Sequence, residues 1–406
     1  MSKLDKTILF LCGVIALSPL SSYLSITLLH FPLNPVELFL LPFIYVLIKQ
    51  FHIRFYFAHL AIFLFFLIEL CLLGLLNPEY TTKGVLSTAR TYLLMGVCFL
   101  AAFNNPDFDL EKVEWLAWGS VAAWVFFSIN FYFEFIPDLT IAESGITYGN
   151  TLAGCFLIFS TAFRRKKVGF SLIVIAVILL SLFAGLRRAI IVFVFSGLLI
   201  ALFFVFRFKI MELLVTLCIA SAAFFTFMNS EDYIKENYPE LHFRVYVKTF
   251  RLAGEEVGLE DDSDEKRKEF YISLLDDPKK RLVPRGFVSK QTLEDDTTGI
   301  FIDCPTHEFV YTLGWPLFLL LLFFYCSNVL HLLMDYIRTK EVEKAILFCV
   351  GCSFLFLLLL DGMVLSFIYI VPLTGCLMGM IYSDKKIKQN EEEEMPALQS
   401  GASVHE

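Results

Sequence analysis

Two adjacent arginines, Arg187 and Arg188, lie where one apolar run ends and the next begins. An arginine in or near hydrocarbon costs about 2.5–3.5 kcal/mol, so it normally faces a cavity, an acidic partner or a bound anion. Two neighbouring guanidiniums can each hold phosphate oxygens in a bidentate fork. The helix that we expect to start at Ala189 adds free N–H groups and the positive end of its dipole. The pair therefore predicts a diphosphate site, with snorkelling toward lipid headgroups as the alternative.

A histidine, His307, stands between a long polar segment, 229–306, and the apolar run that begins at Phe309. Histidine can be neutral near pH 7 and can then accept a proton from an attacking hydroxyl group. None of the other histidines has a comparable setting. A lone histidine is more often structural, so His307 is a candidate base only in combination with the arginines.

Further arginines could join this chemistry. Arg90 lies inside an apolar run, where a structural ion pair or snorkelling is the alternative to a functional role. The polar segment adds several more, namely Arg244, Arg251, Arg267, Arg281 and Arg285.

The remainder of the chain is strongly apolar. Hydrophobic residues make up 57% of the 406 residues, and the mean hydropathy is +0.68. Apolar runs of about 20 residues recur, and each is long enough to cross a hydrocarbon core of ~30 Å. Because these runs are continuous rather than alternating, they indicate helices and not a barrel. We expect an all-α, polytopic membrane protein.

Breaks at charged residues, proline and glycine divide the runs into about twelve expected spans. We place them at residues 7–29, 34–48, 55–76, 85–103, 113–135, 147–163, 168–186, 189–206, 210–228, 308–331, 344–360 and 363–382. Lysine and arginine gather in alternate short connections, which by the positive-inside rule places both termini in the cytoplasm. Residues 1–228 then hold the first nine spans, 229–306 form a large periplasmic loop, 307–382 hold the last three spans, and 383–406 form a disordered cytoplasmic tail.

Composition also excludes several classes. The formal net charge is -8, and no basic stripe interleaved with aromatic residues occurs, so nucleic acid is not an expected partner. Cys349 and Cys352 have C-x-x-C spacing, but they lie in an apolar helix without other soft ligands, which favours packing over metal or redox chemistry. We expect neither a metal nor any other cofactor.

The order of these features resembles that of the O-antigen ligase and polymerase family of membrane glycosyltransferases. The segment Phe183–Ile191 resembles the family's arginine turn before an apolar helix, and Thr306–Gly314 resembles its histidine segment after the large loop. Arg267 followed by aromatic residues, and the turn Leu282–Phe287, are similar to two further motifs of the loop.

Two positions depart from the family's pattern. Leu186 stands where the family usually has serine, and Glu308 stands where it usually has asparagine. These departures bear on how the acceptor is held more than on the class of reaction.

The resemblance implies an inverting, metal-independent transfer of a glycan from undecaprenyl diphosphate at the periplasmic face of a bacterial inner membrane. It assigns His307 as the general base or as the residue that orients the acceptor, and Arg187 as a catalytic residue. Arginines that hold the departing diphosphate more tightly in the transition state would accelerate this step. The candidates for that role are Arg187, Arg188, Arg267, Arg285 and Arg90.

Two acceptors are open: lipid A core, as for a ligase, or a second lipid-linked glycan, as for a polymerase. We expect the ligase, because the arginine turn, the single large loop and the short spacing from His307 to Gly314 are closer to that branch. A transporter of the same lipid-linked glycan is the competing non-enzyme hypothesis. It is disfavoured because few charges lie in or beside the spans, among them Glu37, Glu69, Arg90, Glu134 and Asp361.

Overall fold

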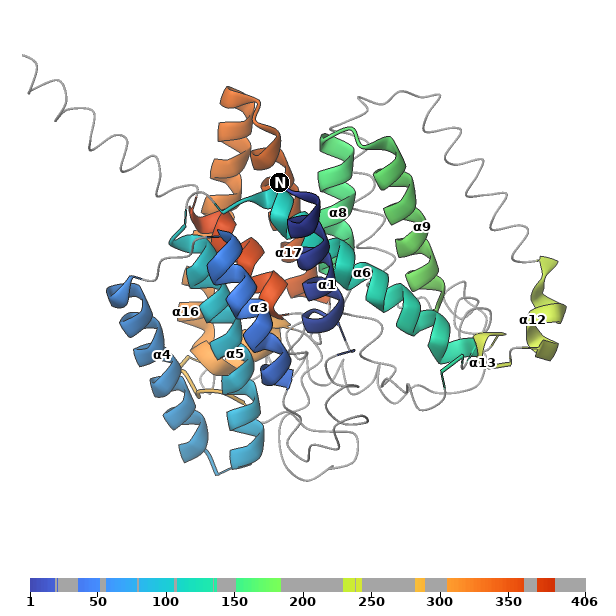
Figure 1. Cartoon of the computed structure of the whole chain (residues 1–406). Helices are drawn as coiled ribbons and strands as arrows, with labels where there is room; N and C mark the ends of the chain where they lie inside the picture. The colour runs from blue at the N-terminus through green and yellow to red at the C-terminus, as the bar shows by residue number, and fades with distance from the viewer. Residues whose placement is uncertain are drawn as a thin grey trace, which may run out of the picture.

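A computed structural model describes residues 1–18, 20, 36–51, 56–78, 80–105, 108–133, 135–136, 151–183, 229–237, 239–242, 282–288, 305–360 and 371–383. Over these ranges the chain folds into helices and contains no β-strand, which confirms the all-α class (Figure 1). The helices are α1 (Lys3–Ala16), α3 (Val36–Phe51), α4 (Phe57–Leu76), α5 (Thr82–Phe103), α6 (Leu110–Phe133), α8 (Thr151–Phe163), α9 (Lys167–Phe183), α12 (Glu231–Asn237), α13 (Pro239–His242), α16 (Pro305–Thr339), α17 (Val342–Leu360) and a last described helix, Val371–Ser383.

Three of the described helices are long and apolar enough to cross a membrane. They are α4, α5 and the part of α16 from Glu308 to Thr339. Most of the other described helices begin and end within about one turn of an expected span. The expected spans 189–206 and 210–228 lie outside the described residues, and the twelve-span arrangement stays a prediction.

The first helix is shorter than expected. A capping box between Ser2 and Asp5 starts α1, and the helix ends at Ala16 instead of continuing to residue 29. The Ser18 hydroxyl donates to the carbonyl of Val14, and Pro19 follows, which has no N–H group for a further helical hydrogen bond. The overall apolarity of residues 7–29 concealed this stop.

Helix α16 is also divided. Gly314 has φ 74° and ψ 159°, which interrupts the helical backbone between a short first part and a long second part. Only glycine adopts this conformation at low cost. Pro316 follows in the first turn of the second part, where its missing N–H group would have had no helical partner.

Glycines bring helices unusually close together. A methyl group added to Gly13 would lie 2.1 Å from the Leu116 carbonyl oxygen of α6. On the last described helix, methyl groups at Gly375 and Gly379 would lie 2.4 Å and 2.3 Å from carbonyl oxygens of α5. This G-x-x-x-G spacing permits backbone contact between helices, as is common in membranes.

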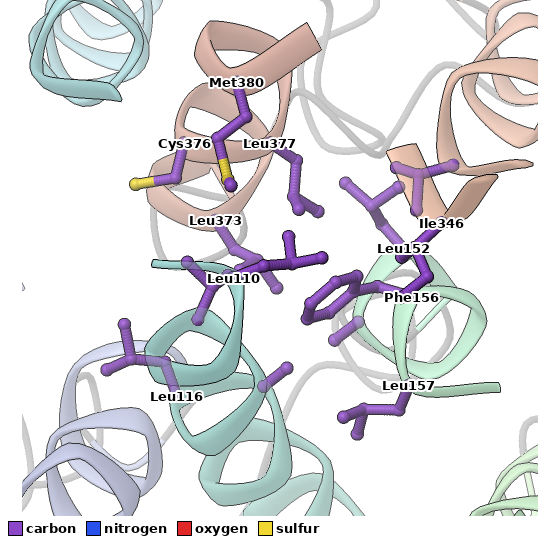
Figure 2. Close-up of a cluster of buried hydrophobic side chains, with 14 of the residues drawn as sticks. Leu110, Leu116, Leu152, Phe156, Leu157, Ile346, Leu373, Cys376, Leu377 and Met380 are labelled. Atoms are coloured by element: carbon purple, nitrogen blue, oxygen red, sulfur yellow. The ribbon is translucent and has the colours of Figure 1, made fainter. Parts of the chain in front are cut away.

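The main hydrophobic core lies among α6, α8, α17 and the last described helix. Figure 2 shows side chains from all four pointing toward one another. The residues labelled there are Leu110, Leu116, Leu152, Phe156, Leu157, Ile346, Leu373, Cys376, Leu377 and Met380.

Basic side chains from separate connections meet at one end of the helix bundle, which we call the basic end. Glu114 of α6 is the buried centre of this network, with 3% of its surface exposed. The last described helix also ends there, because Gly379 packs beside Phe103 at the end of α5. The ion pairs at this end include Lys6–Glu111 (3.6 Å), Arg164–Glu114 (3.6 Å), Lys166–Glu114 (2.9 Å) and Arg164–Glu343 (3.4 Å).

Candidate functional site

A short stretch of the polar segment, residues 282–288, is held between three helices, and we call it the anchored segment. The backbone N–H groups of Arg285 and Gly286 donate to the carbonyls of Tyr311 and Thr312 in α16, each at 3.3 Å. These bonds join the segment directly to the short first part of α16. They place the backbone of Arg285 beside the helical turn that follows His307.

The opposite side of the anchored segment is bound to α4 and α5. Phe287 donates its N–H to the Leu70 carbonyl of α4 at 2.9 Å. The Thr88 hydroxyl of α5 donates to the Val288 carbonyl at 2.9 Å. Because α4 starts and α5 ends at the basic end, these contacts lie toward the opposite end of the bundle, as Figure 1 shows.

Two glycines make this close packing possible. Gly286 has φ 80°, and a methyl group there would lie 2.2 Å from the Gly74 nitrogen and 2.4 Å from the Leu70 oxygen. A methyl group on Gly74 would in turn lie 2.3 Å from the Phe287 oxygen. The Pro-Arg-Gly turn therefore fits against α4 only because neither glycine has a side chain.

Aromatic side chains seal the anchored segment into the bundle. Phe287 is 1% exposed and packs against Val85 and Ala89 of α5. Tyr92 stacks on Phe287 with ring centroids 5.1 Å apart, and its edge meets Phe309 of α16 at 6.1 Å. Tyr92 thus contacts both the anchored segment and the beginning of α16.

A fully buried carboxylate, Glu308, lies beside this aromatic group. None of its surface is exposed, and the Tyr92 hydroxyl lies against it. It lies in the first turn of α16. Ionisable groups buried in a membrane helix mark functional sites by default. In the sequence, Glu308 was interpreted only as a departure from a motif, and Tyr92 was overlooked. The acidic residue directly after His307, at the start of an apolar run, is the sequence feature that could have identified Glu308.

The structure describes some of the predicted site residues and not others. His307 lies in the first turn of α16, while its side chain falls outside the described part of the structure. Arg285 is half-buried in the anchored segment. Arg187, Arg188 and Arg267 lie outside the described residues.

Arg90 is half-buried on α5, between Thr88 and Tyr92. Thr88 and Tyr92 contact the anchored segment, and Arg90 is two positions from each of them. Two positions correspond to a rotation of about 200° around a helix, so the Cα–Cβ bond of Arg90 lies on the face of α5 opposite the anchored segment. Its participation in the same site as Arg285 stays a prediction.

Within the described ranges, no group of three or more His, Cys, Asp or Glu side chains is placed to hold a metal ion. Metal independence of the whole chain stays a prediction.

Fold and site together define a helical protein with three candidate membrane spans among its described residues, in which part of a polar segment is anchored against the start of one of those spans. Comparisons with protein-family models, curated proteins and solved structures found no match to this chain. The resemblance to O-antigen ligases and polymerases therefore depends on the motif residues and their order.

Proposed function

We propose that this chain transfers a glycan from undecaprenyl diphosphate to lipid A core at the periplasmic face of a bacterial inner membrane, as an O-antigen ligase does. One observation supports this most directly. The anchored segment joins Arg285 to the turn of α16 that follows His307, through backbone hydrogen bonds of 3.3 Å. An arginine and a histidine from separate motifs, 22 positions apart by their numbers (307 − 285), are thus held in one region.

The chemistry requires two functions in one place. The acceptor hydroxyl oxygen attacks the anomeric carbon, the bond from that carbon to the diphosphate oxygen breaks, and the diphosphate leaves with the bonding electrons. Arg285 can stabilise the negative charge that grows on the leaving group, since a guanidinium binds phosphate oxygens in a bidentate fork. His307 takes the hydroxyl proton or orients the hydroxyl. Arg187, Arg188, Arg267 and Arg90 complete the proposed diphosphate site.

The proposed topology follows from the charge distribution. Basic connections collect at one end of the bundle, which the positive-inside rule places in the cytoplasm together with both termini. The anchored segment lies toward the other end, on the proposed periplasmic side. The proposed arrangement comprises about twelve spans, with residues 229–306 as the periplasmic loop.

The test compares the banding of lipopolysaccharide from a deletion strain with that from the same strain complemented with the original protein or with variants. We expect the strain to lose O-chain from the core while free polymer accumulates. With Arg285→Ala or His307→Ala, we expect at least a hundredfold less O-chain on the core than with the original protein. Lys235→Ala is the control, because it removes an exposed charge from α12 in the same polar segment. A single repeat on core would assign a polymerase instead. Normal banding from Arg285→Ala protein that inserts normally would remove this residue from the mechanism.

A further inference from the structure

At the basic end, exposed basic side chains lie in or beside two neighbouring turns. The turn between α8 and α9 exposes Arg165 and Lys167, whereas Arg164 and Lys166 pair with Glu114. Arg338 in the last turn of α16 and Lys340 in the connection to α17 are also exposed. We call Arg165, Lys167, Arg338 and Lys340 the basic patch.

The two turns are joined to each other. Arg164 of the first turn pairs with Glu343 of α17 at 3.4 Å, and the rings of Phe163 and Tyr336 meet at 6.4 Å. The acidic residues nearby are already engaged, because Glu343 binds Arg164 and Glu341 binds Lys344 at 3.3 Å. Among the described residues, the basic patch has no ion pair of its own.

Backbone geometry also distinguishes two members of the patch. Arg165 and Lys340 have φ of 54° and 60°, the left-handed conformation in which glycine or asparagine normally ends a helix. No other described residue except glycine has a positive φ. Both helix ends therefore carry a basic side chain at a position where a smaller residue would be less strained.

The location of the patch indicates its partner. The candidate span Glu308–Thr339 ends directly before Lys340, so a bilayer crossed by this span would bring its lipid headgroups close to Arg338 and Lys340. Guanidinium and ammonium groups at that depth meet the phosphates of anionic lipids. We propose that the basic patch binds anionic phospholipid headgroups. The inference does not depend on the proposed transferase activity.

The experiment uses the full chain in neutral detergent, with phosphatidylglycerol or phosphatidylcholine added and bound lipid counted by native mass spectrometry. We expect the protein to retain phosphatidylglycerol preferentially. Each basic residue that contacts the anionic headgroup changes affinity by about fivefold, so the double variant Arg165→Asn, Lys340→Asn should bind phosphatidylglycerol about 25-fold more weakly. Asparagine tolerates the left-handed conformation, so the variant should unfold at no lower temperature than the original protein in lipid-free micelles.

The control variant Lys3→Gln, Lys49→Gln removes the same charge from exposed lysines outside the patch. It should leave the affinity for phosphatidylglycerol within about twofold of the original. An equal loss of affinity for phosphatidylglycerol in the control and patch variants would overturn the proposal, since the net charge of the protein would then explain the binding. Equal binding of phosphatidylglycerol and phosphatidylcholine by the original protein would also overturn it. If the patch variant does not fold, a salt titration of the original protein decides: salt must weaken phosphatidylglycerol binding selectively.

Discussion

Replacing Gly286 by alanine tests whether the anchored segment is held as described. A methyl group at this residue would lie 2.2 Å from the Gly74 nitrogen and 2.4 Å from the Leu70 oxygen, whereas ordinary contact begins near 3.4 Å. Both neighbours are backbone atoms of α4 and cannot rotate away. The segment must therefore move by about an ångström to admit the methyl group.

The cost can be worked from the contacts. Alanine at φ 80° costs about 1–2 kcal/mol in backbone strain. Displacement weakens the hydrogen bonds donated by Arg285, Gly286 and Phe287, each of which contributes about 0.5–1.5 kcal/mol. Together these effects lower the free energy of local opening of the segment by roughly 3–6 kcal/mol, and they lower the free energy of global unfolding by less.

Hydrogen exchange measured by mass spectrometry is the appropriate assay. We expect the amides of residues 285–287 to exchange about 10²–10⁴ times faster in Gly286→Ala, and the proposed glycan transfer to be lost as well. Gly169→Ala in α9 is the matched control, because its methyl group would lie 3.3 Å from the Thr161 Cγ2 methyl and farther from all else. Unchanged exchange of the segment in Gly286→Ala would refute the close packing against α4.

Three further predictions follow from other contacts. Glu114→Gln removes ion pairs of 3.6 Å and 2.9 Å from a buried side chain. Because Arg164 keeps its ion pair with Glu343 and Lys166 reaches water, thermal unfolding should show that the free energy of unfolding falls by about 1–3 kcal/mol. Glu308→Gln keeps the shape of a fully buried side chain but replaces its carboxyl group by an amide. The stability should therefore change by less than about 1 kcal/mol, while the proposed transfer falls more than tenfold; unchanged transfer would assign Glu308 a packing role only. Gly379→Leu should cost about 3 kcal/mol or more, because a Cβ there lies 2.3 Å from the Phe99 oxygen of α5; a stable variant would contradict that helix contact.

The sequence predicted the helical class and most helix positions, since apolar length is a direct requirement of the bilayer. It failed at the end of α1 and at the division of α16, because both depend on single residues within apolar runs. Pro19 and Gly314 are visible in the sequence, yet only the backbone shows that α1 ends at Ala16 and that α16 is divided at Gly314.

The candidate site was predictable only in part. The Pro-Arg-Gly turn and His307 could be chosen by residue type and motif order. Their proximity could not, because it depends on long-range hydrogen bonds from the anchored segment to α16 and α4. The burial of Glu308 beside Tyr92 depends on the packing of α5 against α16, which residue spacing does not encode.

The interruption at Gly314 has a mechanical consequence for a protein in bilayers of varying thickness. A span that is too long or too short for the hydrocarbon layer adjusts by tilting. Residues 315–339 can tilt about the Gly314 hinge while the first part of α16 stays fixed to the anchored segment by its own hydrogen bonds. Such tilting would leave the position of His307 unchanged, whereas a continuous helix would transmit hydrophobic mismatch to it.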